Sequence, residues 1–205
     1  MTLTLSLVAL VSAVITIVAK LDKSDLTQLV FKPLTMMAII LLVFFNSSSP
    51  LTFYQSAILT GLVLSTVGDV FLIRPDEYFL QGLTAFLFGH ICFVAGFWTL
   101  PNWPASVLYA AYFVFFFRIL WKHLGSLKIP VVIYGLTLAL MSWMALSRYL
   151  ETDNTKTLLA FVGSILFIVS DSLLAFNKFR SPLPNAHFWI LVTYFAAQWL
   201  IALSV

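Results

Sequence analysis

Long apolar segments separated by short polar loops constrain this chain more than any other feature of its sequence. Eight such segments fall at residues 3–19, 33–45, 53–73, 79–100, 105–121, 130–147, 157–177 and 186–204. A bilayer's hydrocarbon core of about 30 Å is crossed by roughly 20 helical residues, and a helix satisfies its own backbone hydrogen bonds, as lipid requires. We therefore predict an all-α integral membrane protein with about eight transmembrane helices.

Composition supports this class and excludes several others. Hydrophobic residues make up 61% of the chain and charged residues 9%, with a mean hydropathy of +1.03, whereas roughly a quarter of the residues in soluble domains are charged. The basic residues are scattered through the loops, so no nucleic-acid partner is predicted. The single cysteine, Cys92, rules out a disulfide framework. The first apolar segment lacks the pattern of a removable signal peptide, and we expect it to be a retained span.

The distribution of positive charge predicts the orientation. Nine of the eleven Lys and Arg residues lie in or beside the odd-numbered loops, the first, third, fifth and seventh; they are Lys20, Lys23, Lys32, Arg74, Arg118, Lys122, Lys128, Lys178 and Arg180. The even-numbered loops hold only Arg148 and Lys156. The positive-inside rule therefore predicts cytoplasmic odd loops and both termini on the opposite side. The chain's small size and short loops favour a bacterial inner membrane.

Two short stretches of the chain resemble each other. Residues 67–72 read VGDVFL and residues 169–174 read VSDSLL, at an offset of 102 residues. With an even number of spans in each half, such a repeat would be parallel, as in some transporters. We therefore predict a single transmembrane domain over residues 1–205, with a candidate internal repeat of two parallel four-helix halves, 1–104 and 105–205.

The repeated stretches carry the two aspartates found inside apolar segments, Asp69 and Asp171. A carboxylate near the middle of a span costs about 2.5–3.5 kcal/mol on insertion, so such residues usually face a cavity or a partner. The repeat would place both at similar depth in the cytoplasmic half of the membrane, where they can face one cavity. The alternative is that each carboxyl only hydrogen-bonds a neighbouring helix.

Other polar residues inside the spans are candidates for the same site. His90 can carry a proton or donate a hydrogen bond, or it can be a structural histidine. Lys32 precedes Pro33, which we place at a helix start, and its ammonium group can reach an anionic headgroup or only snorkel to the interface. Tyr194 and Gln198 share one helix face and can bind substrate or join helices. No histidine has a metal-like spacing, so we predict no metal and no cofactor.

Five motifs, in this order, resemble those of the YhhN family of membrane proteins, whose characterised members are lysoplasmalogenases. They are Phe31-Lys32-Pro33-Leu34-Thr35; Gly68-Asp69-Val70-Phe71-Leu72; Gly82 through Phe86 to Gly89-His90; Ser170-Asp171-Ser172-Leu173-Leu174-Ala175 with Asn177-Lys178-Phe179; and Tyr194 with Ala197-Gln198-Trp199-Leu200-Ile201. The resemblance covers nearly the whole chain. One departure is Phe93, where a tyrosine is expected, and it puts in doubt only a hydroxyl contact.

This resemblance implies that the substrate is a lysophospholipid, and that the vinyl ether of a lysoplasmalogen is hydrolysed to a fatty aldehyde and glycerophosphocholine or glycerophosphoethanolamine. Vinyl ether hydrolysis needs an acid, a base and negative charge near an oxocarbenium ion, as in glycosidases. Asp69 and Asp171 are expected to be the general acid and general base, in either order. His90 would assist proton transfer and Lys32 would hold the phosphate. The expected lining residues are Ser170, Asn177, Tyr194 and Gln198.

Two other functions are compatible with the same residues. Paired carboxylates inside the membrane and a parallel repeat also suit a proton-coupled transporter. The sequence shows no matching pair of short helices interrupted by Gly or Pro, which carriers often use. A structural or lipid-binding membrane protein would show neither turnover nor transport.

Overall fold

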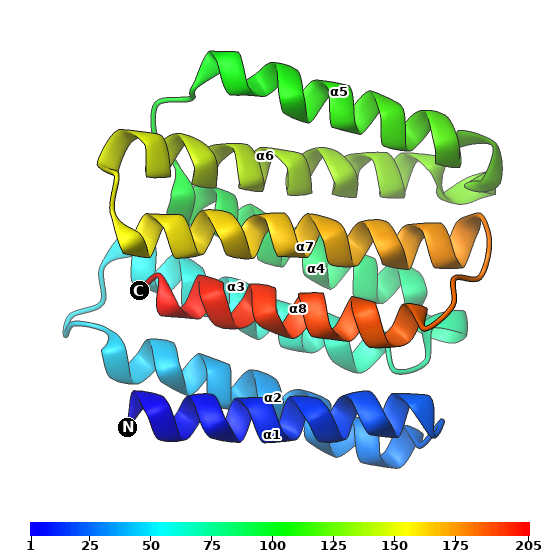
Figure 1. The fold of residues 1–205 in the computed structure, drawn as a ribbon, viewed down its shortest axis with the longest axis horizontal. Helices are drawn as coiled ribbons and strands as arrows, with labels where there is room; N and C mark the ends of the chain where they lie inside the picture. Colours follow the sequence, from blue (N-terminus) through cyan, green and yellow to red (C-terminus); the bar gives the residue numbers. More distant parts are fainter.

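The computed structural model describes all 205 residues as a bundle of eight α-helices and no strand. The helices are α1 (Thr2–Leu21), α2 (Asp25–Asn46), α3 (Phe53–Phe71), α4 (Pro75–Phe97), α5 (Trp103–Leu120), α6 (Lys128–Thr152), α7 (Thr155–Phe179) and α8 (Ala186–Leu203). Two short 3₁₀ turns, Trp121–His123 and Gly125–Leu127, join α5 to α6. Successive helices run in opposite directions, and both termini lie at the same end of the bundle (Figure 1).

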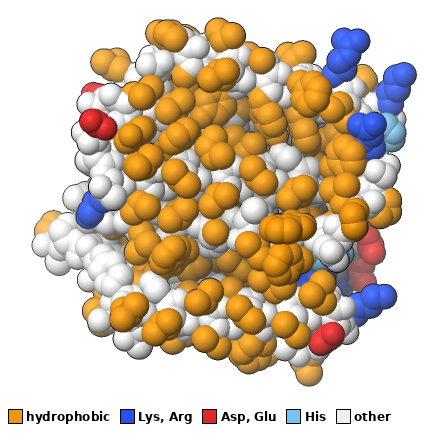
Figure 2. All heavy atoms as spheres, in the orientation of Figure 1, with side chains coloured by type: hydrophobic (Ala, Val, Ile, Leu, Met, Phe, Trp, Pro, Cys, Tyr) orange, Lys and Arg blue, Asp and Glu red, His pale blue; other side chains and the backbone are white.

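The bundle is that of a multi-pass membrane protein. Seven of its helices are long and apolar enough to cross a membrane. The eighth, α3, is 19 residues long but less apolar, because it carries polar residues such as Gln55 and Asp69. Hydrophobic side chains cover most of the face seen in Figure 2, and charged side chains gather at its two edges. The predicted fold class is confirmed.

One predicted boundary is wrong, and the error matters for the site. We placed Pro33 at the start of the second span, whereas α2 begins at Asp25 and holds Pro33 in its interior. The start is set by Ser24, whose side chain accepts a hydrogen bond from the Thr27 backbone N–H, a standard N-cap contact. Lys32 therefore lies two turns inside the helix, with only 7% of its surface exposed.

The odd-numbered loops all lie at one end of the bundle, at the right in Figure 1. The α1–α2, α3–α4, α5–α6 and α7–α8 connections meet there, and the termini and the other connections lie at the opposite end. Most of the basic side chains, among them Lys23, Arg74, Lys122 and Arg180, therefore gather at this end. We call it the basic end.

Small residues let two helix pairs approach closely. A Cβ atom at Gly61 of α3 would lie 2.4 Å from the ring of Phe93 on α4. A Cβ atom at Gly163 of α7 would lie 2.9 Å from the Ala197 carbonyl oxygen and 2.9 Å from Ile201 Cγ1, both on α8. These contacts fix α3 against α4 and α7 against α8, which sets the positions of the two helices that carry the aspartates.

We predict that Gly163→Val destabilises the protein by about 1–3 kcal/mol, the usual cost of overpacking, because the backbone carbonyl of Ala197 cannot move aside. Thermal unfolding in detergent measures the change. The control is Val162→Leu, at a neighbouring position that is 38% exposed on the outside of the bundle and should change stability by less than about 0.5 kcal/mol. Equal stability of Gly163→Val and wild type would contradict the tight α7–α8 contact.

Candidate active site

A buried ion pair joins α2 to α3. Lys32 Nζ lies 3.0 Å from Asp69 Oδ1, and the two side chains are 9% and 2% exposed. The same ammonium group also donates to the Asp69 backbone carbonyl at 3.4 Å. A buried charge is tolerated only when it is paired and hydrogen-bonded. Lys32 is thus the counter-ion of Asp69, not a cation free at the membrane interface.

Tyr194 of α8 completes the environment of Asp69. Its hydroxyl donates to Asp69 Oδ2 at 2.6 Å and accepts a hydrogen bond of 3.2 Å from Gln198 Nε2. Both carboxylate oxygens of Asp69 therefore have a partner, one charged and one neutral. Helices α2, α3 and α8 are therefore held together at this carboxylate.

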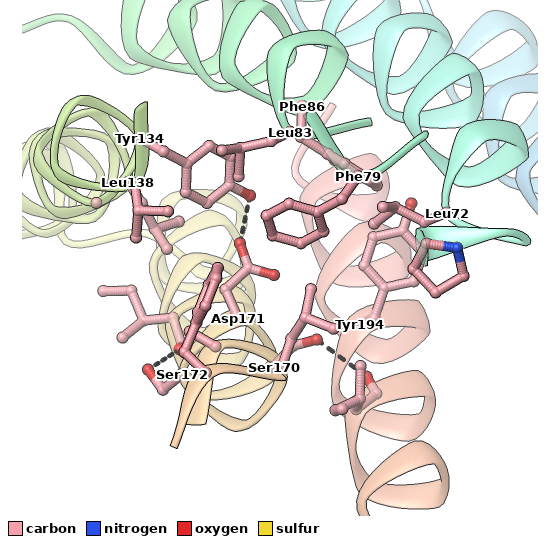
Figure 3. Close-up of a pocket in the computed structure, with 18 of the residues that line it drawn as sticks. Leu72, Phe79, Leu83, Phe86, Tyr134, Leu138, Ser170, Asp171, Ser172 and Tyr194 are labelled. Atoms are coloured by element: carbon pink, nitrogen blue, oxygen red, sulfur yellow. Dashed lines mark hydrogen bonds between the residues drawn. The ribbon is translucent and has the colours of Figure 1, made fainter. Parts of the chain in front are cut away.

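Asp171 of α7 has a different partner. The hydroxyl of Tyr134, on α6, donates to Asp171 Oδ2, as Figure 3 shows. Neither of the two ion pairs in the structure involves Asp171. Its neighbour Ser170 donates from its hydroxyl to the Ile190 carbonyl of α8 at 3.0 Å. The second carboxyl group is therefore held by a neutral phenol.

Both aspartates line one cavity of about 140 Å³, as predicted, and residues from all eight helices contribute to its wall. Lys32, Ser170 and Tyr194 also line it. Nineteen of its 29 lining residues are hydrophobic, among them Phe79 and Leu83, which face Asp171 in Figure 3. A few polar groups converging in an apolar cavity are typical of a small-molecule site.

The cavity extends toward the basic end of the bundle. Lys20 of α1, Gln28 of α2 and His187 of α8 belong to its wall there. Lys20 makes no ion pair, and His187 is exposed. These residues form a polar mouth, which we define as Lys20, Gln28 and His187.

Three predicted site residues, His90, Gln198 and Asn177, are not part of the cavity wall. His90 is fully buried, its ring nitrogens have no hydrogen-bond partner, and its ring centroid lies 4.5 Å from that of Phe167 and 5.2 Å from that of Tyr134. Gln198 reaches the site only through Tyr194. Asn177 accepts a hydrogen bond of 2.9 Å from the Leu183 backbone N–H and orders the α7–α8 loop.

Tyr134 and the polar mouth were not among the site residues predicted from the sequence. Tyr134 lies in an apolar segment, where a tyrosine is an ordinary residue and does not indicate a site. It follows Lys32 at the same 102-residue offset that separates the aspartates. That offset could have revealed it. No group of three or more His, Cys, Asp or Glu side chains is placed to hold a metal ion.

The sequence of this chain matches a known protein family. The model of the YhhN family matches residues 27–205. This chain belongs to the YhhN family. The match includes both aspartates, Lys32, Tyr134 and Tyr194. A search of solved structures finds no match to this chain.

Several relatives of this chain carry a functional name. Lysoplasmalogenase TMEM86B of Sus scrofa is 35% identical over 154 residues, which cover 74% of this chain and 64% of the relative. Lysoplasmalogenase TMEM86A of Homo sapiens is 36% identical over 153 residues, covering 72% and 64%. The uncharacterized membrane protein YhhN of Escherichia coli O6:H1 is 26% identical over 185 residues, covering 86% of each chain. The matched region is thus 64% of the length of these two mammalian relatives.

We predict that Lys32→Met lowers the free energy of unfolding by about 3–5 kcal/mol, because it leaves the Asp69 carboxylate buried without its cation. The double variant Lys32→Met/Asp69→Asn should recover most of this loss, since it removes both charges and keeps an acceptor for Tyr194. Unfolding in detergent of wild type, both single variants and the double variant gives the coupling energy. Additive effects of the two substitutions would contradict a functional ion pair.

Proposed function

We propose that this member of the YhhN family hydrolyses the vinyl ether bond of lysoplasmalogens, releasing a fatty aldehyde and glycerophosphocholine or glycerophosphoethanolamine. The observation that carries the proposal is the pair of carboxyl groups, Asp69 and Asp171, on one apolar cavity within the membrane. The names of the mammalian relatives support the same reaction. A lysophospholipid reaches such a cavity from the bilayer without crossing water.

The reaction requires a proton at the β-carbon of the vinyl ether and then a water at the α-carbon. Two carboxyl groups in one low-dielectric site can serve as general acid and general base. Negative charge on a carboxylate also stabilises the oxocarbenium ion formed between the two steps. Asp69 and Asp171 are the two carboxyl groups that line this cavity.

Residues around the two carboxyl groups have supporting roles in this proposal. Tyr194 fixes the Asp69 carboxylate, and Gln198 fixes Tyr194. Ser170 lines the cavity beside Asp171, while Asn177 shapes the adjoining loop. His90 packs its ring against Tyr134 from behind the wall and helps to hold that side chain in place. The alkenyl chain lies along the apolar part of the wall, which includes Phe113 and Phe116 of α5.

The headgroup is bound at the polar mouth in this proposal. Lys32 is engaged by Asp69, so the phosphate needs another cation, and Lys20 is the lysine in the cavity wall without an ion pair. His187 and Gln28 add hydrogen-bond donors. A phosphate at the mouth leaves the vinyl ether end of the lipid inside the cavity with the carboxyl groups.

The basic end faces the cytoplasm in this proposal, because positively charged loops are retained on that side. Both termini then lie on the opposite side of a bacterial inner membrane. The mouth opens toward the cytoplasmic leaflet, where the lipid substrate would enter.

We expect the purified protein to release aldehyde from lysoplasmenyl-ethanolamine or lysoplasmenyl-choline but not from the saturated ether analogue. Asp69→Asn and Asp171→Asn should each lower kcat at least about 100-fold, the usual contribution of an acid or base. Full activity in both variants would exclude the carboxyl pair. Uptake of the intact lipid into sealed vesicles without cleavage would instead favour a transporter.

We expect Lys20→Gln and His187→Gln each to raise KM roughly three- to tenfold with little change in kcat, because each removes one contact to the phosphate. The matched control is Lys23→Gln, which removes a charge at the same end from an exposed residue outside the cavity wall. Steady-state kinetics in mixed micelles give both constants. If Lys23→Gln raised KM as much as Lys20→Gln, the effect would be general electrostatics and not a headgroup site.

A further inference from the structure

Helices α2, α3 and α4 repeat the main contacts of helices α6, α7 and α8. In the first half α3 packs on α4 and α2 on α3; in the second half α7 packs on α8 and α6 on α7. Between the halves, α4 packs on α6 and α8 packs on α2. If α2, α3 and α4 are relabelled as α6, α7 and α8, and the reverse, the same pairs of neighbouring helices result. The contacts therefore relate the two halves as counterparts.

The close contacts of the small residues fix the register between the halves. Gly61 meets Phe93 in the α3–α4 pair, and Gly163 meets Ile201 in the α7–α8 pair. Gly163 follows Gly61 by 102 residues (61 to 163) and Ile201 follows Phe93 by 108 (93 to 201). Asp69 and Asp171 share the 102-residue offset of the glycines, so they are structural counterparts.

The same offset makes Lys32 and Tyr134 counterparts, since 134 follows 32 by 102 residues. Their contacts agree: Lys32 Nζ binds the carboxylate of Asp69, and the Tyr134 hydroxyl binds the carboxyl group of Asp171. The site thus consists of two half-sites, Lys32 with Asp69 and Tyr134 with Asp171, which have the same construction except for one exchanged residue. A cation in the first is replaced by a neutral phenol in the second.

This exchange determines how charge is distributed in the cavity. The Lys32 ammonium neutralises one carboxylate, and Asp69 is the one it contacts. Lys20, the other lysine of the cavity wall, makes no ion pair with Asp171. Asp171 is half-buried on the mostly hydrophobic wall of the cavity. A second carboxylate there, with only a neutral partner, would be an uncompensated charge in an apolar site, and protonation of the group removes that cost.

We propose that Asp171 is the protonated carboxyl group that acts as the general acid, that Asp69 is the ionised general base, and that Tyr134 is the positioning residue of the acid. The assignment of catalytic roles rests on the proposed hydrolysis. Tyr134 donates to Oδ2 of Asp171 and so leaves Oδ1 to carry the proton toward the substrate. The same hydrogen bond becomes charge-assisted, and therefore stronger, once Asp171 has lost its proton.

The protons balance over one cycle. The Oδ1–H bond of Asp171 breaks as the double bond of the vinyl ether takes the proton at its β-carbon, which leaves an oxocarbenium ion. Water adds to the α-carbon and gives one proton to Asp69, forming a neutral hemiacetal. When the hemiacetal collapses, its hydroxyl proton returns to Asp171 while Asp69 protonates the departing glycerol oxygen. Both carboxyl groups are then in their starting states.

Infrared difference spectra between wild type and variants test which aspartate is protonated. They need no substrate, so the outcome is independent of the proposed hydrolysis. A protonated carboxyl group has a carbonyl stretching band that an ionised carboxylate lacks. We expect this band in wild type and in Asp69→Asn, and its loss in Asp171→Asn. If the Asn variants do not fold, Tyr134→Phe serves instead, because loss of the hydrogen bond shifts the band without removing it.

Tyr134→Lys places in the second half-site the residue found in the first, and it should ionise Asp171. We expect it to remove the infrared band and to lower kcat at least about 100-fold at unchanged KM. Tyr134→Phe should keep the band and lower kcat roughly tenfold, the value of one hydrogen bond. The control Tyr109→Phe removes a similar phenol hydrogen bond, to Ser142 on α6 at 3.0 Å, away from the cavity wall, and should retain both the band and kcat.

Three results would overturn the proposal. Absence of the band from folded wild-type protein would mean that neither carboxyl group is protonated. Loss of the band in Asp69→Asn, with retention in Asp171→Asn, would reverse the roles. Full activity of Tyr134→Lys would show that Asp171 need not be protonated. Absence of aldehyde release from wild type would contradict the hydrolysis alone, with the band still measurable.

Discussion

The ion pair between Lys32 and Asp69 is the interaction on which the rest of the site depends. An apolar bundle in lipid cannot accommodate an isolated carboxylate, because the loss of hydration is not compensated there. The pair lies between α2 and α3, and Tyr194 adds α8 through a hydrogen bond of 2.6 Å. One carboxylate thereby fixes the relative positions of three helices, and these helices form one side of the cavity.

Close helix packing makes this arrangement specific. Gly61 and Gly163 allow α3 to approach α4 and α7 to approach α8, so the two aspartate-bearing helices are each held by a neighbour from their own half. Small residues serve this purpose in membranes, where hydrophobic burial does not drive helices together. The aspartates then face a common space whose remaining wall is mostly hydrophobic, which is the environment that the proposed reaction requires.

Local patterns in the chain predicted much of the fold and part of the site. The apolar blocks gave the class and the order of the helices, and the charge distribution predicted the basic end. The start of α2 was misplaced because Pro33 was interpreted as a helix start, although Ser24 caps the helix earlier. His90 was expected in the site, but it packs among aromatic rings behind the wall. Predicted burial alone does not distinguish a residue that lines the cavity from one that lies behind the cavity wall.

The sequence by itself determined that this chain is a multi-pass membrane protein with two intramembrane carboxyl groups, because hydropathy and the cost of burying charge act residue by residue along the chain. Only the tertiary structure decided which side chain each carboxyl group contacts. Lys32 with Asp69, and Tyr134 with Asp171, are each 37 residues apart in the chain, and each pair meets because of how its helices are rotated and packed. Partner choice depends on that packing, which no local pattern records.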